Sequence, residues 1–273
     1  MSTATSLSPS KPTLTTNDSA VLQALFDAES SPSSAITIDP SLPPLPSSLN
    51  ISAQEHEYLQ SREREIISTL SSTPNPSIQT IQDAIEALDA LVKSHPSYPS
   101  AYANRAQALR ILLETSPTSE SAISREGQEQ QEGKEPTTIF TEQNTPLLST
   151  LLSDLGKAIS LSKPPSPASP VSPLQARLLA DAHTHRAYLL LRVSRYLKSK
   201  PNGEGVPANL KEVGGGPEGL EEMASRDFFF GGRYGNRIAQ QMAVQTNPYA
   251  KMCGAIVKEA LRKEVEGGKE LAG

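Results

Sequence analysis

One spacing of apolar residues recurs along this chain, and it limits the possible folds more than any other feature. Each copy has a second apolar residue four positions after the first and a small or apolar residue three positions later. The copies are Ala84-x3-Leu88-x2-Leu91, Leu151-x3-Leu155-x2-Ala158 and Ala224-x3-Phe228-x2-Gly231, and Ala187-x2-Leu190 keeps part of the spacing. Offsets of three and four place side chains on one face of a helix. Each copy therefore predicts a helix that must pack on a neighbouring helix.

A second phrase, Tyr102-x2-Arg105-Ala106-x2-Leu109, stands six residues after Pro96. It resembles the front half of the 34-residue tetratricopeptide (TPR) repeat, whose back half has the spacing above and ends at a proline. One such helix pair cannot bury its apolar face alone, so several pairs stack into a solenoid with a concave surface. The chain is therefore predicted to be all-α, with three TPR repeats, long inserted loops and C-terminal capping helices.

Composition and cap residues set the expected boundaries. We expect a disordered tail at 1–16, a short amphipathic helix at 17–28, a Ser/Pro linker at 29–51, a TPR domain at 52–266 and a tail at 267–273. Repeat 1 covers about 53–96, repeat 2 about 98–163 with an insert at 115–144, and repeat 3 about 173–234 with an insert at 200–217; capping helices fill 236–266. Helices are expected at about 53–70, 77–94, 98–114, 146–161, 173–198, 218–231 and 236–246. Inserts in turns cost little, since doubling a loop adds only about 0.6 kcal/mol of closure entropy.

Charge and composition exclude several classes of protein. The formal charge is −5 and the pI about 5.5, whereas binding to nucleic acid or to an anionic membrane needs a basic surface. Cys253 is the only cysteine, which rules out an intramolecular disulfide. No apolar run reaches 18 residues, so no membrane span is expected. We expect a soluble monomer of the cytoplasm, with the nucleus as the alternative compartment.

The concave surface of the predicted solenoid is the expected binding site for another protein. The first helices of the three pairs line that surface in TPR proteins, and the repeat positions assign nine residues of this chain to it. They are Tyr58, Arg62, Asn104, Gln107, Arg110, Asp181, His185, Tyr188 and Arg192. Amide, guanidinium and phenol groups suit an extended peptide that carries an acidic group. The alternative is that these residues form only the solvated face of three helices.

Two more specific sites are not supported by the residues. TPR receptors of chaperone tails hold a carboxylate with five Lys, Asn and Arg side chains, and only Asn104 matches that set. A metal site is not expected either, because His183 and His185 are two residues apart and point to opposite faces of a helix. No Ser/His/Asp, Cys/His or paired-carboxylate arrangement stands out, so we expect no enzyme activity and no cofactor.

Three stretches in order resemble the tetratricopeptide repeat protein 36 family. They are Asn17-Asp18-x-Ala20-Val21-Leu22-Gln23-Ala24-Leu25-Phe26, Ala101-Tyr102-x-Asn104-Arg105-Ala106-Gln107-Ala108 and Asn247-Pro248-Tyr249-Ala250-x-Met252-Cys253. The resemblance covers about 160 residues and leaves out the Ser/Pro/Gly-rich inserts. It implies a small non-enzymatic protein that binds other proteins, with an Hsp70-type chaperone as one partner and a link to tyrosine catabolism.

Two hypotheses follow for the function. The first is a protein-binding adaptor or co-chaperone that uses the concave surface. The second is a structural subunit of a larger assembly, buried through its convex face or its terminal helices.

The repeat register also makes a geometric prediction. Arg105 and Arg186 occupy the same position of two first helices, and Asp154 and Asp227 the facing position of the two second helices. Each arginine should therefore pair with the aspartate of its own repeat, across an inserted loop.

Overall fold

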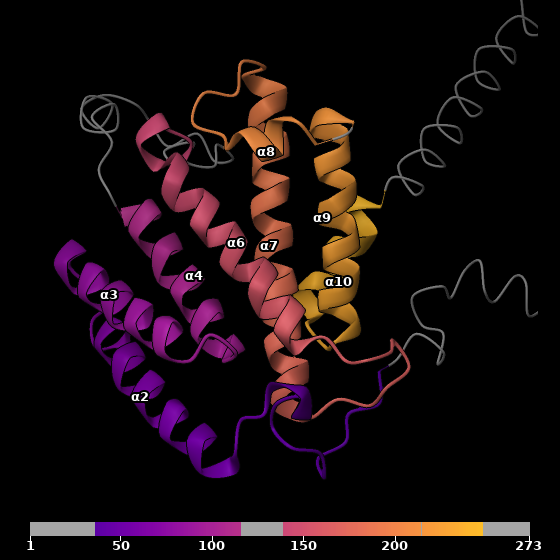
Figure 1. Cartoon of the computed structure of the whole chain (residues 1–273). Coiled ribbons are helices and arrows are strands. Elements are labelled where there is room, and N and C mark those ends of the chain that lie inside the picture. The colour runs from indigo at the N-terminus through magenta and orange to yellow at the C-terminus, as the bar shows by residue number, and fades with distance from the viewer. Residues whose placement is uncertain (1–35, 116–138, 214, 248–273) are drawn as a thin grey trace, which may run out of the picture. The chain divides into compact units, whose positions relative to one another are not determined.

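The computed structural model describes residues 36–115, 139–213 and 215–247. Within these ranges seven helices of ten or more residues follow one another (Figure 1). They are α2 (Ala53–Ser71), α3 (Ile78–Ser94), α4 (Pro99–Thr115), α6 (Thr145–Ser162), α7 (Pro173–Ser199), α9 (Gly216–Arg233) and α10 (Arg237–Thr246). Each lies within two residues of its expected range. Three expected segments fall outside the described residues. They are the 17–28 helix, the helix after Asn247 and most of the 115–144 insert.

The prediction of an all-α chain is confirmed for the described residues. The only extended pairing among them is one parallel bridge between Ile38 and Val171. Each long helix packs on the next one in the chain, from α2 to α10, and the contact between α7 and α9 is the most extensive. Sequence neighbours are therefore neighbours in space, as in stacked helix pairs.

Serine and asparagine caps set the starts of four helices. The side chains of Ser52, Ser77, Ser172 and Asn236 accept the backbone N–H three residues ahead, at 3.0–3.1 Å. Such a bond satisfies one of the backbone donors that a helix start leaves unpaired. The caps fix where α2, α3, α7 and α10 begin, and the Ser52 cap confirms the start predicted for α2.

Two partly buried ion pairs tie helices together across the inserts. Arg105 of α4 donates from Nε and Nη2 to the carboxylate of Asp154 on α6, at 2.7 and 2.5 Å. Arg186 of α7 donates in the same way to Asp227 of α9, at 2.7 Å for both bonds. The predicted pairing is confirmed for both arginines. Only a register that spans the inserts brings these residues together.

Each ion pair has one further member that the repeat register did not predict. Asp89 of α3 accepts a bond from Arg105 Nη1 at 2.6 Å, and His183 Nδ1 lies 2.8 Å from Asp227 Oδ1. Burial raises the pKa of Asp154, although Arg105 opposes it. Burial also works to raise the pKa of Asp227, but the bonds from Arg186 and His183 outweigh it and hold that pKa below its usual value. Asp227 is therefore an anion with two partners.

The described part of the expected linker makes specific contacts with the rest of the chain. In the linker, Asp39 N–H donates to Val171 O at 2.9 Å, and Ser172 Oγ donates to Pro44 O at 2.6 Å. Leu45 is buried. Residues 36–51, the described part of the 29–51 linker, are thus bound to the start of α7.

The roots of the two inserts meet beside the end of α7. Phe140, in the last part of the first insert, lies with its ring centroid 4.6 Å from that of Tyr196. The Tyr196 hydroxyl donates to Glu204 O at 3.0 Å in the second insert. Gly205 has a φ of 77°, and a Cβ there would lie 2.4 Å from the Phe140 carbonyl carbon. The second insert also contains α8 (Ala208–Lys211), where Leu210 is buried.

Two helical glycines differ in what surrounds them. Gly231 lies where α9 crosses α7, and a Cβ there would be 2.6 Å from Thr184 Oγ1 and 3.2 Å from the Ala180 carbonyl oxygen. Gly156 of α6 has only Arg186 Nη1 near that position, at 3.9 Å. The small residue in the third copy of the recurring spacing therefore permits close helix packing, whereas Gly156 does not serve this purpose.

We predict opposite effects of alanine at these two positions. Gly231→Ala should lower the free energy of unfolding by about 1–3 kcal/mol, because the added methyl group forces α9 away from α7. Gly156→Ala should raise it by roughly 0.5–1 kcal/mol through helix propensity. Urea denaturation of the two variants checks both signs. Equal effects at the two sites would contradict the close crossing of α7 and α9.

Loss of the Asp227 carboxylate should be costly. Asp227→Ala leaves Arg186 and His183 without their shared acceptor, and we expect a loss of about 3 kcal/mol in the free energy of unfolding. The double change with Arg186→Ala should cost at least about 1 kcal/mol less than the sum of the single changes. Glu65→Ala is the control, since it removes an exposed pair with Arg62 and should cost about 0.5 kcal/mol or less. Additive losses would show that the pair is not coupled.

Candidate functional site

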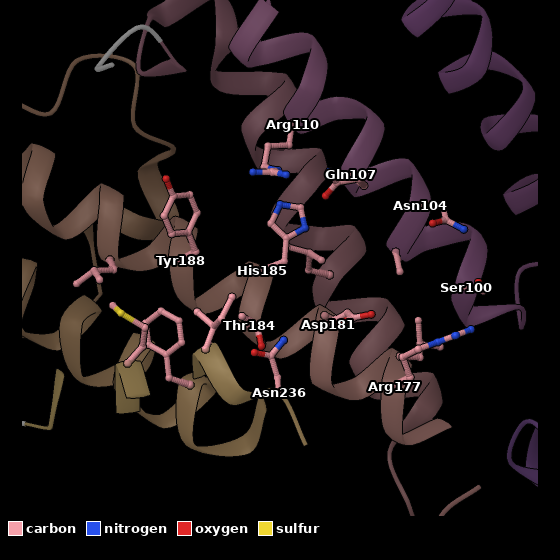
Figure 2. A pocket seen from close by; sticks show the side chains of 18 of the residues that line it. Ser100, Asn104, Gln107, Arg110, Arg177, Asp181, Thr184, His185, Tyr188 and Asn236 are labelled. Atoms are coloured by element: carbon pink, nitrogen blue, oxygen red, sulfur yellow. The ribbon is translucent and has the colours of Figure 1, made fainter. Parts of the chain in front are cut away.

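A cavity of about 990 Å³ lies between α4, α7 and α10. Rows of polar side chains from α4 and α7 point into it, and Asn236 approaches from the start of α10 (Figure 2). We call this cavity the groove. Its polar lining comprises Glu63, Ser100, Asn104, Gln107, Arg110, Arg177, Asp181, Thr184, His185, Tyr188, Arg195, Asn236 and Gln245, and apolar side chains such as Leu178, Leu191, Ile238 and Met242 complete it.

The structure brings six of the nine predicted residues together in the groove. These are Asn104, Gln107 and Arg110 from α4 and Asp181, His185 and Tyr188 from α7. Residues three or four apart on each of these helices share one face. The helical spacing that predicted these six is therefore the reason why they meet.

The other three predicted residues do not line the groove. Tyr58 is 58% exposed, and Arg62 pairs with Glu65 on the outer surface of α2. Glu63, the residue after Arg62, lines the groove instead, because one residue turns a helix by about 100°. Arg192 is buried; its Nη1 lies 3.3 Å from Glu114 Oε1 and its guanidinium 5.5 Å from the Tyr188 ring centroid.

The residues missed by sequence reasoning fall into two groups. Arg177 lies four residues before Asp181 on the same helical face, so the spacing of α7 could have revealed it. The α10 wall, with Asn236, Ile238 and Met242, could not be found in this way. That helix was predicted only as a cap, and no repeat position assigned its side chains to the concave surface.

Glu63 is a buried carboxylate with two neutral partners. It accepts a bond from the Tyr98 hydroxyl at 3.0 Å and from Asn104 Nδ2 at 2.5 Å. Burial first, and then the charge of Glu63, raise the pKa of Tyr98, so its hydroxyl remains a donor. The Asn104 amide group thus already donates within the protein. This argues further against recognition of a chaperone-tail carboxylate. Asn104 was the only residue that matched the five side chains which TPR receptors use to hold that carboxylate.

His185 and Arg110 meet in the middle of the groove. Burial lowers the pKa of His185 to about 4, and the positive charge of Arg110 lowers it as well. The ring is therefore neutral at pH 7. His185 Nε2 and Arg110 Nε are both buried, and neither has a hydrogen-bond partner among the described residues. Buried polar atoms in proteins are nearly always paired, so these two nitrogens mark a place where a ligand atom would be stabilised.

Asp181 gives the groove a negative charge one helical turn from His185. Desolvation by the groove walls raises the pKa of this carboxyl, and the charge of Arg177 opposes the rise. A smaller cavity of about 340 Å³ continues from Arg177, Asp181 and Asn236 to Ile38 and Tyr234. The groove is therefore longer than the space between α4 and α7 alone.

The two neighbouring histidines of α7 have different surroundings. His183 is buried against Asp227 and contacts the rings of Phe230 and Tyr234, whereas His185 faces the groove. This matches the expectation that residues two apart point to opposite sides. In the part of the chain that the structure covers, no three His, Cys, Asp or Glu side chains are placed to hold a metal ion.

One relative covers almost the whole chain. The L-tyrosine degradation gene cluster protein hmgX of Aspergillus fumigatus is 61% identical over 270 residues, which are 98% of this chain and 99% of that protein. This chain belongs to the hmgX family. No model of a known protein family matches the sequence, and no solved structure matches it. In residues 36–115, 139–213 and 215–247, no helix is long and apolar enough to span a membrane.

The comparison corrects one prediction. The resemblance to the tetratricopeptide repeat protein 36 family is wrong, because the near full-length relative carries a different name and no TPR family model matches. The middle of the three quoted stretches consists of small and polar residues at helical spacing, which many helical repeats share. The other two stretches lie outside the described residues, except for Asn247.

The titration of His185 can be tested through stability. An unfolded histidine has a pKa of about 6.5, so between pH 6.5 and pH 4 the unfolded chain binds a proton that the folded His185 resists. Stability should therefore fall as the pH is lowered, by about 2 kcal/mol between pH 7 and pH 5 from this group. His185→Gln removes the titrating ring and should reduce the loss by that amount. Denaturation at both pH values checks this, and an unchanged loss in the variant would contradict the burial of a neutral His185.

Proposed function

We propose that the protein is a non-enzymatic adaptor that binds another protein in its groove and serves L-tyrosine degradation. The groove is the observation that carries the proposal. It is long, and polar side chains at helical spacing from α4 and α7 face each other across it. Such a surface suits an extended peptide segment, whose backbone groups need donors and acceptors along their length.

The proposal treats the helices as three stacked TPR-type pairs, α2 with α3, α4 with α6, and α7 with α9. The repeats would then be 53–96, 98–163 and 173–234, as the sequence suggests. Support comes from the equivalent ion pairs of the second and third pairs, and from α4 and α7, two first helices that share one cavity.

The link to tyrosine comes from the relative. The printed name of hmgX places that protein in an L-tyrosine degradation gene cluster. Because this chain is 61% identical to hmgX over nearly the full length, we propose that it serves the same process. Its partner would be an enzyme or a regulator of that process. An Hsp70-type partner rests on the corrected resemblance alone, so the proposal does not include it.

A non-enzymatic role fits the polar groups of the groove. Glu63 is already engaged by Tyr98 and Asn104, and the pair formed by His183 and Asp227 lies between α7 and α9 instead of facing the groove. The neutral His185 faces Arg110, whose positive charge disfavours protonation of the ring. These groups are arranged to bind and not to transfer protons.

A structural role in a larger assembly is the second candidate. Phe229 of α9 and Val244 of α10 are 41% and 44% exposed, although both are large and apolar. Exposed apolar residues on the last described helices are what a buried terminal interface would need. If this role is correct, Phe229→Ser should abolish assembly while changes in the groove have no effect.

The groove is tested by comparing partners of matched variants. Gln107→Ala with Arg110→Ala removes two groove side chains, and Gln82→Ala with Lys93→Ala removes the same kinds of group from the exposed surface of α3. The proteins are purified from cells of the native organism growing on L-tyrosine, and mass spectrometry identifies what copurifies.

The groove variant should lose at least 90% of the partner that the wild-type protein and the α3 variant retain. The same variant should fail to restore growth on L-tyrosine in a strain that lacks the gene. Equal partner recovery by all three proteins would refute the groove as the binding site. Normal growth on L-tyrosine without the gene would refute the role in tyrosine degradation.

A further inference from the structure

The turn between α6 and α7 carries one short pattern three times. Residues 164–173 read Pro-Pro-Ser-Pro-Ala-Ser-Pro-Val-Ser-Pro, so Ser166, Ser169 and Ser172 each have a proline two positions before and one position after. No other serine or threonine of the sequence stands between two prolines in this way. Proline-directed protein kinases transfer phosphate to a serine that precedes a proline. By sequence alone, the three serines are therefore equivalent candidates for phosphorylation.

The fold makes the three serines unequal. Ser172 is 1% exposed, and its hydroxyl group donates to Pro44 O at 2.6 Å and accepts from Gln175 N–H at 3.1 Å. Ser169 is half-buried, whereas Ser166 and both of its neighbours in the chain are exposed. A kinase must reach the hydroxyl group that it phosphorylates, so Ser166 is the serine of this turn that the folded protein presents.

Groups that bind phosphate already lie around Ser166. Ala168 N–H donates to Ser166 Oγ at 3.4 Å. Arg233, the last residue of α9, reaches the same turn and donates from Nη2 to the carbonyl oxygen of Pro167 at 3.1 Å. Lys163, three residues before Ser166, is exposed and adds a second cation. A guanidinium has five N–H donors and forms short, charge-assisted hydrogen bonds with phosphate, so Arg233 can bind a phosphate in addition to the Pro167 carbonyl.

We propose that Ser166 is a phosphorylation site for a proline-directed kinase, and that Arg233 binds the phosphate once it is attached. In the transfer, the Ser166 oxygen forms a bond to the γ-phosphorus of ATP. The bond from that phosphorus to the β,γ-bridging oxygen breaks, and ADP leaves with the electron pair. The proton of the serine hydroxyl passes to a base of the kinase. The inference does not depend on the proposed function of the groove.

The phosphate would fasten the α6–α7 turn to the corner between α9 and α10. Arg233 ends α9, and Asn236, three residues later, caps α10 and lines the groove. Phosphoserine carries a charge of about −1.5 to −2 at pH 7, so its bond to Arg233 is stronger than the present bond to a neutral carbonyl. Phosphorylation therefore stiffens the corner that positions the α10 wall of the groove.

The choice among the three serines is tested by treating the full-length protein with an active MAP kinase and MgATP. Mass spectrometry follows the phosphate on each serine over time, and a synthetic peptide of residues 160–176 is the unfolded reference. The ratio of the Ser166 rate to the Ser172 rate should be at least tenfold higher in the protein than in the peptide, because Ser172 reacts only after local opening of the chain. Equal ratios, or no phosphate on Ser166, would overturn the proposed site.

The same site should be occupied in cells. The protein is purified with phosphatase inhibitors from the native organism growing on L-tyrosine and, separately, on glucose, and its phosphopeptides are mapped. We expect phosphate on Ser166 in at least one of the two cultures. Its absence from both would show that the accessible serine is not used.

The role of Arg233 is tested on protein in which phosphoserine is placed at position 166 alone, by incorporation during translation. A guanidinium bound to the phosphate stabilises the dianion. The phosphate, followed by phosphorus NMR, should therefore titrate at a pH at least about 0.5 lower than in the phosphorylated 160–176 peptide. Arg233→Gln should return the titration to that of the peptide. The matched control Arg64→Gln, which makes the same change on the exposed surface of α2, should leave it lowered. A wild-type phosphate that titrates as in the peptide, or one that Arg233→Gln does not alter, would refute binding by Arg233.

Discussion

The bidentate bonds of Arg105 to Asp154 and of Arg186 to Asp227 hold α4 against α6 and α7 against α9. No short turn connects either of these two pairs of helices. A short turn would keep two helices of a pair in register, but long inserts stand between α4 and α6 and between α7 and α9. An arginine cannot lose its charge at physiological pH, so a partly buried guanidinium needs a carboxylate at a fixed place. The planar groups also fix the rotation of one helix against the other. The position of α4 and α7, and with it the groove, depends on these contacts.

The same interactions show why part of this structure could be predicted from the sequence. Offsets of three and four residues follow from helix geometry. They therefore predicted the helices, their buried faces and the facing positions of arginine and aspartate. They also gave six groove residues, because one face of α4 and one face of α7 meet in space. The cap residue Ser52 predicted the start of α2, since its hydrogen bond is local.

The features that escaped prediction depend on contacts between segments without a period. The bond between Ser172 and Pro44 joins the start of α7 to a stretch of Ser and Pro that no pattern distinguishes from a linker. The α10 wall of the groove follows from where that helix packs on α9, which no repeat position encodes. On α2 an error of one residue was enough to replace Glu63 by Arg62, because neighbouring residues of a helix face directions about 100° apart. Family assignment failed for a related reason, since generic helical phrases carry little information about ancestry.

The two insert roots meet on Tyr196 through contacts that do not depend on the covalent link between α4 and α6. Phe140 and Gly205 are packed against each other, and the ion pair of Arg105 with Asp154 lies on the helices beyond them. A protease cut between Thr115 and Ile139 would remove a covalent link and none of these contacts. The fragments on either side of such a cut would then be joined by these noncovalent contacts, as two parts of one fold.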